Sequence, residues 1–271
     1  MNYLQLEFET LNAGECEILI ALLAEAGFES FEEEEQSLKA FIKEDEFIEE
    51  SLEDILQVVP VKYTVTVVPQ QNWNAQWESG FEPIIVDSFV GIRAGFHKPI
   101  ENVQHEIIIT PKMSFGTGHH ATTYMMIGQM ENIDFKNKTV VDFGTGTAVL
   151  AILADKMGAI SIDAIDYDEW SIENSIENAS INNCSVIKLI KADTISTGNT
   201  YDIILANINL NVIIDNLAAI KESSKKGTII LLSGFMKVDE TIMFKALAEY
   251  NIQGLKAVQN GEWICIYAQM N

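Results

Sequence analysis

The first 69 residues alternate apolar and polar positions in four short segments and repeat apolar residues at helical spacing in two longer ones. The alternating segments are YLQLEFET, SFEEEE, SLKAFIKE and KYTVTVVP, and period-two alternation predicts half-buried strands. The helical segments are NAGECEILIALLAEAGF, which we expect Gly27 to end, and DEFIEESLEDILQVV, which we expect Asp45 to cap. The βαββαβ order predicts a small ferredoxin-like α+β domain over residues 1–69.

A linker without this periodicity is predicted over residues 70–83. It contains Trp73 and Trp77, and their i, i+4 spacing places both rings on one face of a helix. We interpret this pair as packing anchors between two domains.

From residue 84 onward the pattern changes to continuous apolar runs separated by helical periods. Short strands in IIV, FVGIRA and HEIIIT precede a helix in ATTYMMIGQM, and the runs TVVDFG, SIDAID, VIKLIK, YDIILANI and GTIILLSG follow. Helical patterns accompany these runs at residues 147–157, 168–180, 209–222 and 237–250. Continuous apolar strands that alternate with helices predict a parallel sheet covered on both faces.

The C-terminal end departs from a purely parallel sheet. Asn260 and Gly261 form a turn signal between the alternating runs GLKAVQ and EWICIYAQM, which predicts an antiparallel hairpin. A Rossmann-like doubly wound α/β sheet that ends in such a hairpin is the outline of the class I methyltransferase fold, which we expect over residues 84–271. Ordinary dinucleotide-binding domains do not usually end this way.

The tetrapeptide FGTG at residues 143–146 follows an apolar run and precedes a helical pattern. Gly144 and Gly146 allow backbone angles closed to other residues and let the main chain approach a ligand. Asp142 precedes them and can accept hydrogen bonds from the turn amides or from a ligand amine. The third glycine of a dinucleotide fingerprint would fall on Val149, which argues against a pyrophosphate loop.

Two further aspartates end apolar runs in the same way. Asp166 lies 20 residues beyond Gly146, where an acidic side chain can bind both ribose hydroxyls, and Asp193 can contact an adenine amine. Each aspartate alone is equally compatible with a helix cap or a turn. Together with Asp142, at successive strand ends beside a Gly-x-Gly turn, they predict a site for an adenosine-type cofactor.

The run YDIILANI ends at a side chain that can recognise a substrate. Asn207 offers both a hydrogen-bond donor and an acceptor, so it can hold a substrate nitrogen. The alternative is that Asn207 caps the following helix.

FGTG also occurs at residues 115–118, inside SFGTGHHATT. Ser114 stands where Asp142 stands in the other copy, so we expect this stretch to be a loop that closes over the cofactor rather than a repeat. His119 and His120 are adjacent and cannot share one face of a helix, so no metal site is predicted.

The composition narrows the choice of partners. The 271 residues include 40 acidic and 17 basic ones, which give a net charge of −23. This sign disfavours direct binding of nucleic acid and favours a basic partner, although an acidic surface can also serve solubility alone. The absence of 18-residue apolar runs and of a secretory pattern, together with three scattered cysteines, predicts a cytoplasmic protein without membrane contact. We also expect a monomer, although no pattern in the sequence specifies the oligomeric state.

Several of these stretches together are similar to the ribosomal protein L11 methyltransferase family. The shared motifs are the loop FGTGHHATT, the linker WNAQW, the turn DFGTGTA, the strand end DAID, an ANI-L motif and the closing strand GEWICIYAQM. The resemblance implies methyl transfer from S-adenosylmethionine to amino groups of ribosomal protein L11, namely lysine ε-amines and the N-terminal α-amine. The small N-terminal domain would recognise this basic substrate through its acidic face.

Carried over by position, the family's cofactor contacts fall on Thr123, Gly144, Asp166 and Asn207. Asn207 is also expected to orient the accepting amine, and no side chain is assigned as a general base. The chain departs from the family's pattern at Ala148, which replaces the third glycine of the turn, and at Asn209, which replaces a leucine and bears on the acceptor pocket. The other residues expected in the cofactor site are Phe115, Gly116, Thr117, Gly118, His120, Asp142, Gly146 and Asp193.

Three alternatives stay open at this point. A class I methyltransferase that acts on another protein or a small molecule is disfavoured by the FGTG-x-H-x-TT loop. An NAD-dependent oxidoreductase is disfavoured by Val149 and the terminal hairpin. A non-catalytic binding module on the same fold is disfavoured by the presence of Asp142, Asp166 and Asn207.

Overall fold

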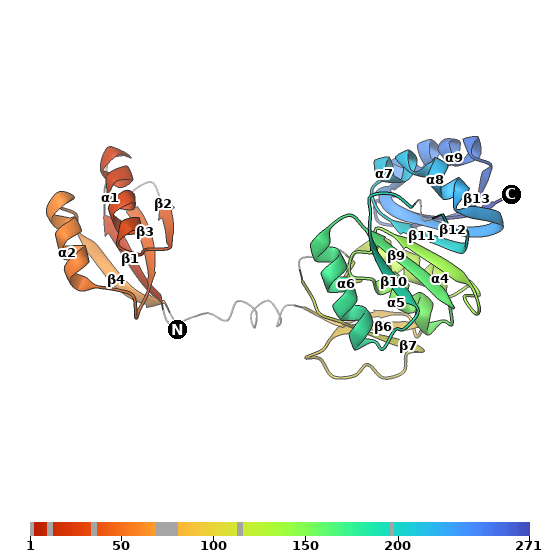
Figure 1. Cartoon of the computed structure of the whole chain (residues 1–271), viewed down its shortest axis with the longest axis horizontal. Coiled ribbons are helices and arrows are strands. Elements are labelled where there is room, and N and C mark those ends of the chain that lie inside the picture. The colour runs from red at the N-terminus through yellow and green to blue at the C-terminus, as the bar shows by residue number, and fades with distance from the viewer. Residues whose placement is uncertain (1–2, 10–12, 34–36, 69–80, 113–115, 196–197) are drawn as a thin grey trace. The chain divides into compact units, whose positions relative to one another are not determined.

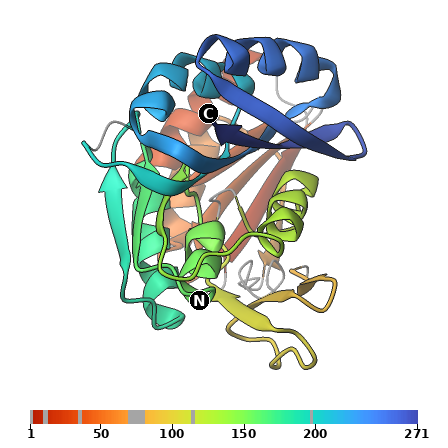
Figure 2. The same cartoon turned by 90° about the vertical axis from the view of Figure 1, so that its right-hand side faces the viewer.

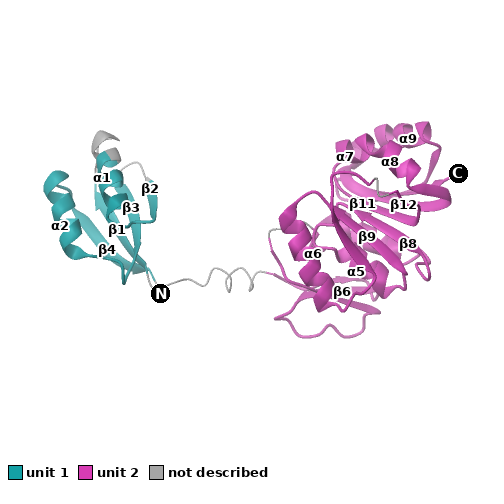
Figure 3. Cartoon of the chain, viewed as in Figure 1, with its two compact units in different colours: residues 1–80 teal, residues 81–271 magenta. Residues whose placement is uncertain are grey.

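The chain forms two compact units, residues 1–80 and 81–271 (Figure 1, and coloured separately in Figure 3). The computed structural model describes residues 3–9, 13–33, 37–68, 81–112, 116–195 and 198–271. The predicted linker falls across the division between the units, and its Trp73 and Trp77 lie outside the described residues.

The first unit has the predicted βαββαβ order. Its four strands form one sheet in the order β2-β3-β1-β4, and all neighbouring strands are antiparallel. This order confirms the ferredoxin-like arrangement. The elements are β1 (Tyr3–Glu9), α1 (Ala13–Glu25), β2 (Ser30–Glu33), β3 (Ser37–Lys43), α2 (Glu49–Val58) and β4 (Tyr63–Val68).

The alternation of buried and less buried residues along the strands decides which face of this sheet the helices cover. Leu6 and Phe8 of β1 are fully buried and pack in one cluster with Leu23 of α1 and Leu52 of α2. Figure 1 shows the two helices side by side over the sheet.

The two predicted helix ends in this unit have different outcomes. Gly27 has a φ of +94° just beyond α1, as expected of a glycine that ends a helix. The prediction that Asp45 caps the second helix is wrong. The chain turns at Lys43–Glu46, so α2 begins only at Glu49 with Ile48 at the N-cap.

The second unit contains the predicted doubly wound sheet. Its strand order is β10-β9-β8-β11-β12-β14-β13, with β10, β9, β8, β11 and β12 parallel and the β13–β14 hairpin antiparallel (Figure 2, dark blue at the C-terminus). The strands are β8 (Thr139–Phe143), β9 (Ser161–Asp166), β10 (Ile187–Lys191), β11 (Tyr201–Asn207), β12 (Ser224–Met236), β13 (Ile252–Asn260) and β14 (Trp263–Met270).

Helices bury both faces of this sheet, because the central strands carry apolar residues on both sides. One cluster packs α4 (Ala121–Met130) and α5 (Val149–Lys156) onto one face, and a second packs α7 (Leu210–Asp215), α8 (Leu217–Glu222) and α9 (Glu240–Glu249) onto the other. A short η1 (Lys237–Asp239) precedes α9, and α6 (Glu169–Ile181) lies between β9 and β10 in the chain. Among the described residues, no helix has the length and apolar character needed to cross a membrane.

The single helix expected over residues 209–222 is instead two short ones. Asn216 has non-helical backbone angles between α7 and α8, and its side-chain amide donates to the Val212 carbonyl at 2.9 Å. A side chain that bonds the preceding turn competes with continuation of the helix.

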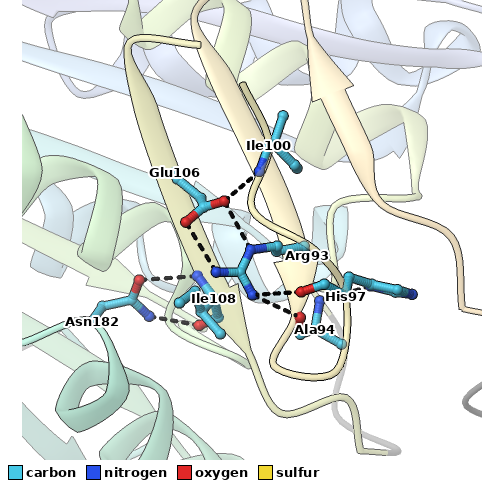
Figure 4. Close-up of polar contacts among 7 residues, drawn as sticks. All are labelled: Arg93, Ala94, His97, Ile100, Glu106, Ile108 and Asn182. Atoms are coloured by element: carbon cyan, nitrogen blue, oxygen red, sulfur yellow. Dashed lines mark hydrogen bonds and ion pairs between the residues drawn. The ribbon is translucent and has the colours of Figure 1, made fainter. Parts of the chain in front are cut away.

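A three-stranded sheet, β5 (Ile84–Val86), β6 (Val90–Ala94) and β7 (His105–Ile109), precedes the doubly wound one. The β6–β7 pair is held by Arg93, which is buried and forms a two-point ion pair with Glu106 at 2.8 and 3.1 Å (Figure 4). The Arg93 guanidinium also donates to the carbonyls of Ala94 and His97. The hydrogen bond from Arg93 lowers the pKa of the Glu106 carboxyl.

Removing the Arg93 charge should therefore destabilise the second unit. We expect Arg93→Met to lower the free energy of unfolding by about 3 kcal/mol, because it leaves a partly buried carboxylate and two carbonyls without their donor. The control is Lys191→Met, which breaks the exposed Lys191–Glu169 pair and should cost less than about 1 kcal/mol. Urea unfolding measures both, and equal losses in the two variants would contradict the role given to Arg93.

Candidate functional site

A cavity of about 880 Å³ opens at the carboxyl ends of the parallel strands, where ligand sites form in doubly wound sheets. Six of the residues expected in the cofactor site line it: His120, Gly144, Gly146, Asp166, Asp193 and Asn207. The other lining residues are Lys112, Phe143, Tyr167, Asp168, Trp170, Ser171, Ala192, Ile208, Asn209, Val212, Gly234 and Trp263.

Close contacts of two glycines with one residue form one side of the cavity. Ile208, just after β11, packs on Gly144, which follows β8, and on Gly234, which lies near the end of β12. A Cβ added to Gly144 would lie 2.0 Å from Cγ2 of Ile208, and one added to Gly234 would lie 2.3 Å from its carbonyl oxygen. Only glycine fits at these two positions, where φ is +75° and +97°.

The amides of the glycine turn are already used within the protein. The Gly144 and Thr145 N–H groups donate to the Ile165 carbonyl, and the Gly146 N–H donates to Asp166 Oδ2 at 2.9 Å. A turn whose amides are satisfied in this way offers no ready cradle for phosphate. This observation argues against a pyrophosphate ligand.

Asp166 ends β9 at the cavity wall and is held in place by the main chain. Its second oxygen accepts from the Asp168 N–H at 3.0 Å. Each carboxylate oxygen retains capacity for a further hydrogen bond, so Asp166 can still receive two ligand hydroxyls.

Asp142 lies behind the turn rather than in the cavity wall. Its Oδ2 accepts from the Thr145 hydroxyl at 2.6 Å, so it bonds a turn side chain and not the turn amides considered in the sequence analysis. Burial raises the pKa of Asp142 to about 7, and the nearby charge of Asp166 adds to the effect.

Asn207 lines the cavity with its side chain almost fully buried, at 8% exposure. Its amide group donates to the Thr123 hydroxyl at 3.1 Å, and its Oδ1 has no hydrogen-bond partner among the described residues. The cap on the following helix is Asn209, whose Oδ1 accepts from the Val212 N–H at 3.1 Å. Asn207 is therefore not the cap of this helix, and its Oδ1 is a buried acceptor without a partner among the described residues.

The first FGTG stretch lies near the cavity, and only part of it is described. Phe115 lies outside the described residues. The Gly116 carbonyl accepts from the Thr147 hydroxyl at 2.6 Å, Thr117 bonds the His119 ring, and Gly118 packs tightly on Ile92. Of the residues expected in the cofactor site and described, Gly116, Thr117, Gly118, Thr123 and Asp142 are not in the cavity wall.

His120 joins this stretch to the cavity. It is the N-cap of α4, with its Nδ1 2.8 Å from the Thr122 hydroxyl, and its ring meets Trp263 edge-on at 4.5 Å. In the described part of the chain no three His, Cys, Asp or Glu side chains gather as a metal site would require.

The ionised side chains of the cavity wall are mainly acidic. Asp166, Asp168 and Asp193 line it, against the single lysine Lys112. Such a wall favours a ligand with a positive charge and repels one that carries phosphates.

Twelve lining residues are not among those expected in the cofactor site, and they include Tyr167, Trp170, Gly234 and Trp263. Tyr167 and Trp170 are each 75% exposed, which is unusual for large aromatic rings at a cavity. Their position within four residues of the strand-end Asp166 is the signal that could have found them. Gly234 follows an apolar run as Gly144 does, and the same rule could have been applied to it.

Ala148, the third position of the turn motif, has a left-handed backbone with φ of +64°. This conformation is unfavourable for a residue with a Cβ, which explains why glycine suits the position. Ala148 is fully buried and is not part of the cavity wall among the described residues.

The raised pKa of Asp142 predicts a pH-dependent stability. The unfolded carboxyl has a pKa of about 3.9, so between about pH 4 and pH 7 the folded chain holds a proton that the unfolded chain releases. Stability should therefore fall as pH rises through this window, by at most roughly 1.4 kcal/mol per pH unit. We expect Asp142→Asn to melt higher than the wild type by a margin that is larger at pH 7.5 than at pH 5.

Asp202→Asn is the control for this comparison. Although burial opposes ionisation of Asp202, hydrogen bonds from Lys225 and Thr139 lower its pKa to about 2, so it is ionised at both pH values. Its substitution should shift the melting temperature equally at pH 5 and pH 7.5. An Asp142→Asn shift that is the same at both pH values would show that Asp142 does not hold a proton in this range.

Comparison with known proteins shows which family the chain matches. Residues 15–271 match the model of the family described as ribosomal protein L11 methyltransferase (PrmA). The chain is 36% identical to a ribosomal protein L11 methyltransferase of Bacteroides thetaiotaomicron over 97% of its length and 96% of that protein, and 39% identical to one of Porphyromonas gingivalis over 84% and 81%.

A solved structure is also similar. The ribosomal protein L11 methylase of Lactobacillus delbrueckii subsp. bulgaricus superposes with a TM-score of 0.66 and 27% identity, covering 70% of this chain and all of that one. These matches agree with the sheet order, the glycine turn and the strand-end carboxylates described above. The chain belongs to the ribosomal protein L11 methyltransferase family.

Proposed function

We propose that this protein transfers methyl groups from S-adenosylmethionine to amino groups of ribosomal protein L11, at lysine side chains and at the N-terminal α-amine. The observation that carries the proposal is Asn207, which lines the cavity with a buried amide whose Oδ1 lacks a partner among the described residues. Family membership supplies the reaction and the substrate class.

The residues of the cavity fit this cofactor. S-adenosylmethionine carries a sulfonium charge and no phosphate, which suits the acidic wall and the turn whose amides are satisfied internally. Asp166 would accept the ribose hydroxyls, and Asp193 would accept from the adenine amine. The aromatic rings of Tyr167 and Trp170 offer apolar surface beside them. The cofactor supplies an activated methyl group on its charged sulfur.

The protein's own contribution is then mainly positioning. Thr123 holds the Asn207 amide nitrogen, which leaves Oδ1 to accept a hydrogen bond from a donor such as an amine. A free lysine has a pKa of about 10.4 and must lose a proton before it can accept a methyl group. Removal from water lowers that pKa, and His120 and Trp263 help to exclude water at this end of the cavity.

The proposal is tested with labelled S-adenosylmethionine, purified L11 and a mixture of other ribosomal proteins, with the label mapped by mass spectrometry. We expect label on L11, and we expect Asn207→Ala to lower the rate roughly 100-fold, since one positioning contact commonly supplies that much. Asn132→Ala, an exposed amide near the end of α4, is the matched control and should keep the wild-type rate.

The possible outcomes test the proposed substrate and the proposed cofactor separately. Label on other ribosomal proteins and none on L11 would contradict the proposal that L11 is the substrate, but not the proposal that S-adenosylmethionine is the cofactor. Failure to bind S-adenosylhomocysteine would contradict both. Equal rates for Asn207→Ala and Asn132→Ala would contradict the role of Asn207.

We further propose that the first unit, including the 1–69 domain predicted from the sequence, recognises the substrate and that the protein acts as a cytoplasmic monomer. Support comes from residues 44–54, where seven acidic and no basic side chains occur. Glu49, Glu50 and Glu53 are exposed on α2, whose apolar side packs inward through Leu52. A surface of this charge speeds encounter with a basic protein.

Reversing these charges should weaken use of the protein substrate alone. We expect the triple change Glu49→Lys, Glu50→Lys and Glu53→Lys to lower kcat/KM for L11 roughly tenfold at low salt, with a smaller effect at high salt. Affinity for S-adenosylhomocysteine should not change.

The matched control reverses three exposed glutamates of the second unit: Glu131→Lys, Glu222→Lys and Glu249→Lys. An equal loss in the control would show that net charge matters and the α2 face does not. The recognition hypothesis also assumes that free L11 is the substrate, so higher activity on assembled ribosomal subunits would contradict it.

A further inference from the structure

The two FGTG stretches are joined by one side chain. Thr147, directly after the second stretch, donates its hydroxyl hydrogen to the carbonyl of Gly116 in the first stretch at 2.6 Å. The Thr147 side chain is fully buried. A buried hydroxyl of this kind has no water to replace its partner, so the contact fixes the distance between the two stretches.

The main chain of Thr147 is tied to the segment that leads into the first stretch. Asn178 on α6 is fully buried, its amide group donates to the Thr147 carbonyl at 3.0 Å, and its Oδ1 accepts from the Thr110 N–H at 2.8 Å. Thr110 follows the last residue of β7. Thr147 is therefore linked both to Thr110, through Asn178, and to Gly116, through its own hydroxyl.

The position of Gly116 matters because the chain continues from there into the site. Four residues later His120 lines the cavity, and Thr123 accepts the hydrogen bond that orients Asn207. Gly116 has a φ of +102°, and a Cβ added to it would lie 3.0 Å from Thr147 Oγ1. The two residues are thus in direct contact, and a side chain at position 116 would crowd the Thr147 hydroxyl.

We propose that Thr147 is a positioning residue, which sets the segment Gly116–Thr123 against the glycine turn and so determines the affinity for the cofactor. The inference rests on the proposed function. Thr147 is not in the cavity wall among the described residues, so it acts through Gly116 and not by touching the cofactor.

The test compares Thr147→Val, which removes the hydroxyl and keeps the shape, with Thr147→Ser, which keeps the hydroxyl. Calorimetry with S-adenosylhomocysteine should give a Kd about tenfold higher for Thr147→Val, the size of effect expected from one buried hydrogen bond. Thr147→Ser should stay within about twofold of the wild type.

Thr228→Val is the structural control. Thr228 is also buried, and its hydroxyl donates to the Tyr201 carbonyl at 2.6 Å, next to the start of β11 and away from the cavity. Its substitution should lower the melting temperature at least as much as Thr147→Val does, but leave the Kd for S-adenosylhomocysteine unchanged. This difference separates positioning from general stability.

If Thr147→Val does not fold, Asn178→Asp tests the position of Thr147 through its other link, the hydrogen bond to its main-chain carbonyl. It keeps the acceptor for Thr110 but loses the donor to Thr147, and it should also raise the Kd. A folded Thr147→Val, or failing that Asn178→Asp, that binds as tightly as the wild type would overturn this inference alone. A wild-type protein that binds no S-adenosylhomocysteine would overturn the proposed function and this inference with it.

Discussion

The close approach of the strand ends around Ile208 is the constraint on which the site depends. Gly144 and Gly234 contact this residue at distances that no other side chain allows, and Gly234 lies in an irregularity of the β12–β14 pairing. Ile208 therefore packs its side chain on Gly144 and its main chain on Gly234, and this holds the carboxyl ends of β8, β11 and β12 together at the cavity. Asn207 at the end of β11 and Asp166 at the end of β9 line the same cavity.

The close packing of these strand ends also explains why the pKa of Asp142 is raised. A carboxyl at the end of a central strand, beneath a turn that is packed on its neighbours, has no access to water, so it holds a proton near neutral pH. The turn's amides meanwhile bond to Ile165 and Asp166 of the next strand. The turn is therefore complete without a ligand, and the acidic wall of the cavity favours a ligand with a positive charge.

The elements with a clear period could be predicted from the sequence, and so could the residues that end them. Apolar runs predicted the parallel strands because a strand covered on both faces has no polar side, and Asp166, Asp193 and Asn207 followed from the rule that such strands present ligand groups at their carboxyl ends. The break at Asn216 and the late start of α2 depend on local hydrogen bonds that periodicity does not report.

The polar residues of α6 could not be predicted for a different reason. Asn174, Asn178 and Asn182 recur every four residues, which in a sequence indicates the solvent face of a helix. All three are buried, because they bond the main chain of β7 and Thr110, as Figure 4 shows for Asn182 and Ile108. A strand edge satisfies the amides of Asn178 and Asn182 as water would, whereas Asn174 Oδ1 has no hydrogen-bond partner among the described residues.

Through the asparagines of this helix, the three-stranded sheet is connected to the glycine turn at the site. Arg93 and Glu106 hold β6 to β7, α6 bonds the edge of β7, and Asn178 of the same helix bonds the glycine turn. Gly118 of the first FGTG stretch packs on Ile92 of β6, and Gly116 bonds Thr147, so the described part of this stretch contacts both the glycine turn and a sheet that is not part of the doubly wound fold. Fold class alone would therefore locate the cofactor, whereas the segment from Gly116 to Thr123 that orients Asn207 depends on this additional sheet.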